Sequence, residues 1–312
     1  MRRPSLLMLA ISALPWLSAW ACTGADPDAM GADTLSVMAP EAIAVVALGW
    51  RNPDPDGAGK AQVYVVEHAP GKRAAALELL AMPAAALVLD TSLGVGECRV
   101  EGPRGDPGRI LLRDAGEIIV EDELGASVLD SSWVSEGLLD VTGVSYAGFL
   151  GARAARRGPV EVTADGSPDV GPFSVMLAVP PAVRLLSIGG HDVVRGRVPL
   201  EEGELTLSLD VTWEPLAVPP TATAIAAAPT SSDLTVVVFE RRSFGATWTI
   251  SCAVEDDGHF RIPAAAFLML PDLGSDRTDS VLVRRIASAS FSARNLPEGL
   301  AVSVTEDQAY VE

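Results

Sequence analysis

Three cysteines are the residues of this sequence whose chemistry is easiest to anticipate. Cys22 follows an apolar N-terminal segment, whereas Cys98 and Cys252 each lie inside strand-like sequence. In an exported protein, one disulfide among three cysteines leaves one thiol over, and a lipid attached to Cys22 would remove that odd thiol. We therefore predict lipidation of Cys22 and a disulfide between Cys98 and Cys252. Two separate buried thiols are the alternative for Cys98 and Cys252.

The N-terminal segment predicts export. Residues 2 and 3 are arginines, and Leu6–Ala21 follows as an apolar run without charge. A basic start, a short apolar core and small residues before the cleavage point together predict a signal peptide over residues 1–21. Residues 17–22 resemble a bacterial lipoprotein box, although Ala19 and Trp20 depart from its commonest residues. An ordinary signal peptidase would cut the same bond, which leaves open an outer-membrane lipoprotein or a periplasmic or extracellular protein.

One loop has the residue types of a weak calcium site. Asn52, Asp54 and Asp56 occupy positions 1, 3 and 5 of an EF-hand-like spacing, with Gly57 at position 6. A complete loop needs a bidentate Glu at position 12, and Val63 stands there instead. A solvated hairpin loop is therefore the preferred interpretation, with a weak calcium site as the alternative, and we expect the protein to bind no other cofactor.

Other catalytic patterns are weak in this sequence. Residues 143–148 approximate the G-x-S-x-G nucleophile elbow, but that motif requires an α/β sheet and the surrounding sequence predicts strands. The three histidines share no metal-ligand spacing, and the cysteines form no C-x-x-C pair. A basic stretch, Arg153–Arg157, precedes a predicted strand and is interpreted as a charged loop, with contact to anionic lipid or polysaccharide as the alternative.

Composition narrows the class of protein. The 312-residue chain is 48% apolar, which is too high for a disordered protein, and its net charge of −18 argues against a nucleic-acid partner. Removal of residues 1–21 would remove two arginines and no acid, leaving 21 basic against 41 acidic residues and a charge of −20. This charge indicates solubility in the envelope compartment rather than a particular substrate.

The elements expected to position these residues are mostly strands. Alternating and β-branched runs separated by Gly, Pro and Asp indicate an all-β protein of antiparallel sandwiches. The expected strands include Ala86–Leu89, Leu234–Phe239 and Leu300–Val304. Two short helices are predicted over Arg73–Met82 and Ala264–Leu270. The proline pair at 180 and 181 predicts a domain boundary. The expected order is a signal peptide (1–21), a flexible tether (22–38), and two tandem immunoglobulin-like β-sandwich domains (39–180 and 181–312).

Three segments resemble a group of exported bacterial β-sandwich proteins, many with lipoprotein signals. They are Leu112–Ile118, Pro168–Ser174 and Cys252–Pro263, the last containing an Asp-Asp-Gly turn that predicts a hairpin. The resemblance covers roughly residues 85–310 and implies fold and export, but no activity. We therefore expect a non-enzymatic envelope lipoprotein that binds or scaffolds an envelope protein or polysaccharide and contacts the membrane through Cys22. The alternative is a secreted hydrolase with a carboxylate site in a sandwich groove.

Overall fold

A curved sheet of eleven strands organises the fold. The computed structural model describes residues 40–52, 58–89, 93–103, 105–135, 140–152, 158–200, 208–216, 234–272 and 276–312. The sheet has the order β3-β16-β15-β18-β19-β1-β2-β4-β8-β7, and the short β13 pairs with β19 beside it. Its strands are β1 (Glu41–Asn52), β2 (Ala58–His68), β3 (Cys98–Glu101), β4 (Ile110–Arg113), β7 (Asp130–Val134), β8 (Val141–Ala152), β13 (Arg197–Val198), β15 (Leu234–Ser243), β16 (Ala246–Val254), β18 (Thr278–Ala293) and β19 (Leu296–Val311).

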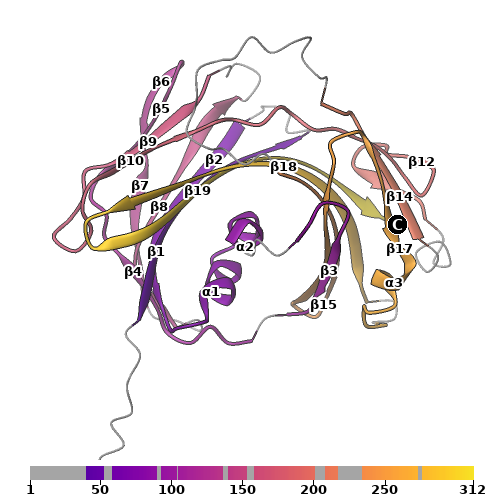
Figure 1. Cartoon of the computed structure of the whole chain (residues 1–312), viewed down its shortest axis with the longest axis horizontal. Helices are drawn as coiled ribbons and strands as arrows, with labels where there is room; N and C mark the ends of the chain where they lie inside the picture. The colour runs from indigo at the N-terminus through magenta and orange to yellow at the C-terminus, as the bar shows by residue number, and fades with distance from the viewer. Residues whose placement is uncertain are drawn as a thin grey trace, which may run out of the picture. The chain divides into compact units, whose positions relative to one another are not determined.

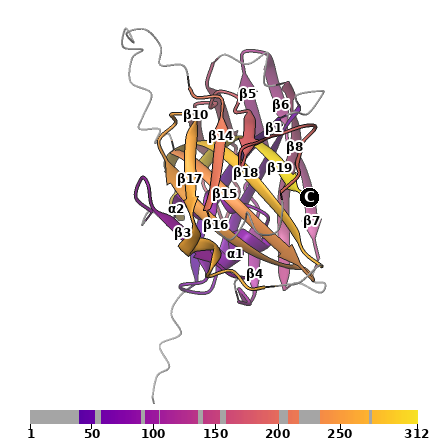
Figure 2. The same ribbon diagram turned by 90° about the vertical axis from the view of Figure 1, so that its right-hand side faces the viewer.

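Two smaller antiparallel sheets pack against the convex face of this curved sheet (Figure 1). One has the order β10-β9-β5-β6 and the other β12-β11-β14-β17. Figure 2 shows β14 and β17 of the second sheet in front of β15 and β16. Their strands are β5 (Ile118–Asp122), β6 (Gly125–Val128), β9 (Val160–Ala164), β10 (Phe173–Leu177), β11 (Leu185–Ile188), β12 (His191–Asp192), β14 (Ser208–Trp213) and β17 (His259–Pro263).

Alternation along the long strands explains this layering. In β19, Ala301 packs into the core below the first small sheet, whereas Val302 and Val304 pack on the opposite face. Since successive side chains of a strand point to opposite faces, one strand can supply two cores. The described residues form three cores, of which two lie on the convex side, one under each small sheet, and the third lies on the concave side. The prediction of an all-β fold with stacked sheets is confirmed.

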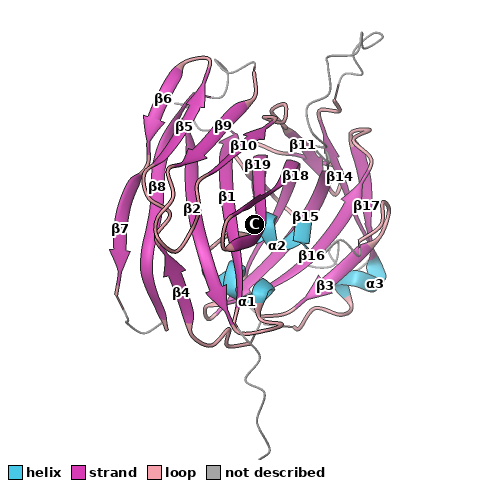
Figure 3. Cartoon of the chain, turned by 60° about the vertical axis from the view of Figure 1, so that its left-hand side comes forward, coloured by secondary structure: helices cyan, strands magenta, loops and turns pink. Residues whose placement is uncertain are grey.

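Helices α1 (Arg73–Leu79) and α2 (Pro83–Leu89) fill part of the concave side of the sheet (Figures 1 and 3). The predicted helix over Arg73–Met82 is confirmed as α1, and the predicted helix after Pro263 is confirmed as the shorter α3 (Ala264–Phe267). The predicted strand at residues 86–89 is wrong, because α2 covers them. Its proline stands at the first helical position, where the missing N–H costs nothing and the fixed φ suits a helix.

The turn between α1 and α2 is a Schellman motif. The amide of Met82 donates to the carbonyl of Leu77 at 2.9 Å, and the amide of Ala81 donates to the carbonyl of Glu78 at 3.0 Å. Ala81 has φ +57, a left-handed conformation that favours glycine. Leu77 and Met82 are both buried in the concave core, which supplies the apolar contact that accompanies this motif.

The two predicted domains share one sheet. β1 lies before the predicted boundary at residues 180 and 181, yet it pairs in parallel with β19 from Ala44↔Gly299 to Asn52↔Asp307. β3 also precedes that boundary and pairs with β16. Residues 39–312 form one compact unit. The predicted division into sandwiches over 39–180 and 181–312 therefore does not describe the strand pairing, because the hydrogen bonds of the central sheet cross it.

The Asp-Asp-Gly turn at residues 256–258 joins two different sheets rather than forming the predicted hairpin. β16 before it belongs to the central sheet, and β17 after it belongs to a convex sheet. Gly258 has the positive φ, +90, that the turn requires. Asp256 is held by the indole N–H of Trp213 at 2.8 Å and by the guanidinium of Arg285, which fixes the chain at the point where it changes sheets.

Candidate binding groove

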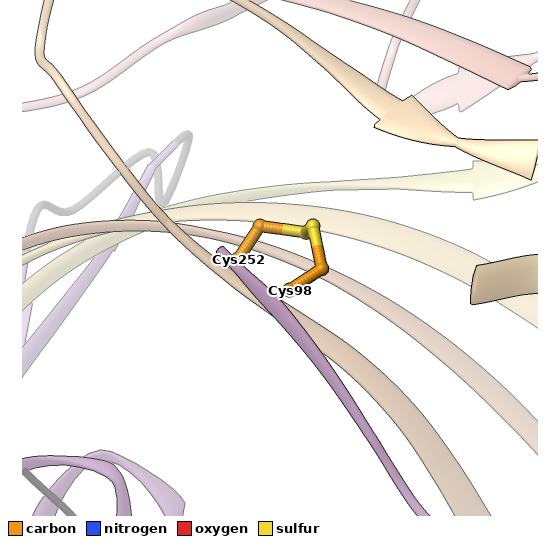
Figure 4. The surroundings of a disulfide bond; sticks show 2 residues. All are labelled: Cys98 and Cys252. Carbon is orange, nitrogen blue, oxygen red and sulfur yellow. A yellow bond between two sulfur atoms is a disulfide. The ribbon is translucent and has the colours of Figure 1, made fainter. Parts of the chain in front are cut away.

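The predicted disulfide between Cys98 and Cys252 is present (Figure 4). The two residues lie opposite each other in the β3–β16 pair, with 4.1 Å between their Cα atoms. β3 is an edge strand of four residues at the end of the central sheet. The segment with α1 and α2, which joins β2 to β3, is here called the helical connection. Because β3 follows it, the disulfide holds the C-terminal end of the helical connection on the sheet.

Most of the other predicted site residues lie outside the described residues. Cys22, Asp54 and Asp56 lie outside the described residues, and Asn52 is the last residue of β1 with a side chain that is not described. Lipidation and the weak calcium site therefore stay predictions. Within the described ranges, no group of three or more His, Cys, Asp or Glu side chains could hold a metal ion.

A groove of about 430 Å³ opens between α2 and the concave face of the central sheet. The residues that line it at the point where helix and strand face each other are small: Ala47 and Gly49 on β1, and Ala84 and Ala85 on α2. Small side chains on both walls leave space that larger residues would fill. Met82, Val302 and Val304 complete an apolar wall on the same groove.

Strand register brings the polar residues of the groove together. Arg51 of β1 lies opposite Glu306 of β19, which in turn lies opposite Arg284 of β18. The Arg284 Nε donates to Glu306 at 2.9 Å, and the Arg51 Nε donates to the other carboxylate oxygen at 3.2 Å. Glu306 therefore has two guanidinium partners at the floor of the groove.

The electrostatic setting of Glu306 differs from that of a catalytic acid. Burial alone would raise the pKa of Glu306, but the charges and hydrogen bonds of Arg284 and Arg51 outweigh it and hold this pKa below its ordinary value. A general acid at neutral pH needs a raised pKa. Glu306 is thus suited to orienting the two arginines and is poorly suited to donating a proton.

On the same face of the sheet, a second set of cross-strand neighbours combines a cation with apolar groups. Gly49 lies opposite Val304 on one side and Lys60 on the other, and Lys60 lies opposite Phe149 of β8. Among the described residues, Lys60 has no ion-pair or hydrogen-bond partner. Phe149 is 78% exposed, so the residue opposite Lys60 has an accessible aromatic side chain.

A smaller cavity of about 280 Å³ adjoins the groove at Arg284 and at the α1–α2 turn. Its polar residues include Glu240 and Arg242 of β15. Arg242 donates to Glu240 at 2.6 Å, and Glu240 lies 3.8 Å from the guanidinium of Arg284. The concave face thus carries alternating charges from Arg51 to Arg242. The whole chain is strongly acidic, yet the described residues that line the larger groove include three cations and one carboxylate.

Another polar cluster lies on an exposed face of the second convex sheet. Arg261 donates two hydrogen bonds to Asp210, at 2.7 and 2.9 Å, and His259 lies 3.3 Å from the same carboxylate. The hydrogen bond from Arg261 is the main cause that lowers the pKa of Asp210. Because Arg261 occupies both carboxylate oxygens in a bidentate pair, Asp210 is committed to a cross-strand ion pair.

The groove was not among the sites predicted from sequence. Its residues come from β1, β2, β18, β19 and the helical connection, and no short motif contains them. The sequence signal for the groove is a change from apolar to charged residues along one face of a strand. In β19, this face carries Val302 and Val304 and then Glu306. Residues 143–148, which approximate a nucleophile elbow, lie in β8, as the strand interpretation predicted.

Comparison with models of protein families, with curated proteins and with solved structures finds no match for this chain. The resemblance to exported bacterial β-sandwich proteins therefore stays a prediction. None of the described helices is both long and apolar enough to cross a membrane.

Proposed function

We propose that the protein is a cell-envelope lipoprotein with a non-catalytic binding role, and that it holds its ligand in the groove beside α2. The observation that carries the binding role is the groove itself. It has one apolar wall, cations on its floor and rim, and a size of about 430 Å³, within the range of roughly 300–1,000 Å³ that is common for small-molecule sites.

The proposal of export and anchoring rests on the sequence. The basic start, the apolar run and Cys22 at the expected cleavage point support a lipid anchor, and Thr23–Asp33 supports a polar tether. The Cys98–Cys252 disulfide is consistent with an oxidising compartment. A membrane contact through Cys22 would then hold the binding domain close to envelope proteins, polysaccharides or lipids.

The anchoring can be tested by fractionating cells that express the full chain and measuring the mass of the N-terminal peptide. We expect the protein in the membrane fraction, with a peptide that begins at a diacylglyceryl Cys22. The variant Cys22→Ser should move the protein to the soluble fraction. An unmodified N-terminus at residue 22 in a soluble wild-type protein would contradict lipidation and leave simple secretion.

The hydrolase alternative has a specific test because the groove and its neighbouring cavity each contain a carboxylate. Glu306 and Glu240 both contact Arg284, and the pKa of Glu306 is lowered, whereas the general acid of a glycosidase pair needs a raised pKa. We expect no turnover of chromogenic glycosides or esters that depends on these residues. Turnover lost in Glu306→Gln but kept in Glu67→Gln, whose carboxylate pairs with Arg113, would favour the hydrolase.

A further inference from the structure

The groove presents two chemically different surfaces to one ligand. Ala81 and Pro83 of the helical connection and Ala47 of β1 are apolar groove residues that solvent can reach. The groove is also lined by residues that are buried in the concave core: Met82, Ala85, Val302 and Val304. The same groove is lined by Arg51, Lys60 and Arg284. A ligand that fills it must therefore contact hydrocarbon along one part and cations along another.

Among the described residues, Arg51 and Arg284 have acidic partners, whereas Lys60 has none. Glu306 is the acidic residue among the described residues that line the groove, and it is shared by Arg51 and Arg284. Glu240 also lies 3.8 Å from Arg284. Lys60 lies one strand further along the sheet, opposite Gly49, and its side chain is exposed. The guanidinium of Arg51 is also accessible, with 54% of its side chain exposed. An anionic group placed between Lys60 and Arg51 would gain two charge-assisted hydrogen bonds.

We infer that the groove binds an amphipathic anion, a molecule with one anionic group on an alkyl chain. The anionic group contacts Lys60 and Arg51, and the alkyl chain lies against Ala47, Ala81 and Pro83, the accessible apolar residues of the groove. This inference rests on the proposed binding role and specifies its ligand. An uncharged alkyl chain would leave Lys60 without a partner, and a small anion would leave the accessible apolar residues in contact with water.

Gly49 gives the inference a steric test that leaves every charge in place. A Cβ at Gly49 would meet no atom within 4 Å, and the residue does not have a positive φ. Its side of the strand is the groove side, between Val304 and Lys60. Gly49→Leu should therefore fill the groove without disturbing the sheet. Gly105 is an exposed loop glycine that also has open space around its Cβ, so Gly105→Leu is the matched control.

The experiment is a calorimetric titration of the full chain with three probes at concentrations where each is monomeric. Dodecanoate carries both features, dodecyltrimethylammonium has the same chain with a cationic group, and butyrate has the same anionic group with a short chain. We expect saturable binding of one dodecanoate per chain, and binding at least about tenfold weaker for each of the other two probes. Lys60→Gln should weaken dodecanoate binding about tenfold, and Gly49→Leu should abolish it.

The results distinguish a failure of the proposed ligand class from a failure of the proposed binding role. Equal affinity for dodecyltrimethylammonium, lost in Gly49→Leu, would overturn the anionic ligand class while leaving the groove as a binding site. Dodecanoate binding that survives Gly49→Leu, or that Lys60→Gln leaves unchanged, would also overturn the inference. If none of the probes binds, the inference is wrong. The binding role is then tested separately, by whether the protein isolated from the cell envelope retains a bound small molecule. Unfolding midpoints of all variants verify that they fold.

Discussion

At the scale of single residues, Glu306 links the groove to the stability of the fold. Its carboxylate accepts hydrogen bonds from Arg284 and Arg51, and the pKa of Glu306 is lower in the folded protein than its ordinary value of 4.5. A carboxyl group with a depressed folded pKa stabilises the folded state above its unfolded pKa. That contribution is lost as the pH falls through the folded pKa.

The variant Glu306→Gln should therefore reduce the free energy of unfolding at pH 7 by about 2 kcal/mol, and by less at pH 3. Urea denaturation of the wild type and the variant at both pH values measures the two differences. A difference that does not shrink between pH 7 and pH 3 would show that the ion pairs with Arg284 and Arg51 do not hold Glu306 in its charged form.

Asp307, the next residue in the chain, supplies a control of opposite sign. Burial raises the pKa of Asp307, against the hydrogen bonds that it accepts from the amides of Leu185 and Gln308. An acid with a raised folded pKa weakens the folded state at higher pH, and this effect begins to weaken as the pH falls through the folded pKa and is gone below the unfolded pKa. The stability of the wild type relative to Asp307→Asn should therefore increase from pH 7 to low pH, in the direction opposite to Glu306→Gln.

At the scale of elements, the helical connection depends on a residue that is poorly suited to its conformation. Ala81 has φ +57 at the position after the end of α1 where glycine is preferred. Ala81→Gly should raise the free energy of unfolding by about 0.5–1 kcal/mol, measured by urea denaturation. Ala85→Gly, inside α2, is the control and should lower it by about 1 kcal/mol. Destabilisation by both variants would contradict the strain at Ala81.

The disulfide fixes the edge strand that ends this connection. Cys98 and Cys252 are 154 residues apart in sequence, and the chain-entropy model gives a stabilisation of about 5 kcal/mol for closing a loop of that length. The double variant Cys98→Ser/Cys252→Ser should therefore unfold at lower urea concentration, and reductant should have the same effect on the wild type. Full thiol labelling of the denatured wild type without reductant would rule the bond out.

Element type was predictable where a segment was long or had clear end signals. β19 and β15 follow from extended β-branched runs, and α3 from its position after Pro263. The apolar run Ala86–Leu89 was misassigned because four apolar residues fit a buried strand and a helix equally well. Pro83 three residues earlier was the available helix signal. The sheet that β17 joins could not be predicted from sequence, since a turn does not specify whether the next strand pairs with the preceding one or joins another sheet.

At the scale of the whole molecule, the groove depends on pairings that are remote in sequence. Gly49 lies beside Val304 only because β1 pairs in parallel with β19, and Arg51 reaches Glu306 by the same register. Local patterns determine strand faces, but not which strands become neighbours across more than 200 residues. For this reason the all-β class and the disulfide were predictable from sequence, whereas the shared sheet and the groove were not.

The same pairing gives the binding proposal its structural basis. The N-terminal strands β1 and β2 contribute Arg51, Gly49 and Lys60, and the C-terminal strands β18 and β19 contribute Arg284 and Glu306. The helical connection between β2 and β3 supplies the opposite wall. Because residues from both ends of the chain form the groove, a ligand bound there should raise the unfolding midpoint of the entire unit.

The most direct test of the account is native mass spectrometry of the protein isolated from the cell envelope. The wild type should retain a small-molecule adduct, which Gly105→Leu keeps and Gly49→Leu loses. The adduct should dissociate on acid denaturation and be identified by its mass. Absence of an adduct from the wild type, or an equal amount in wild type and Gly49→Leu, would contradict the assignment of the groove beside α2 as the binding site.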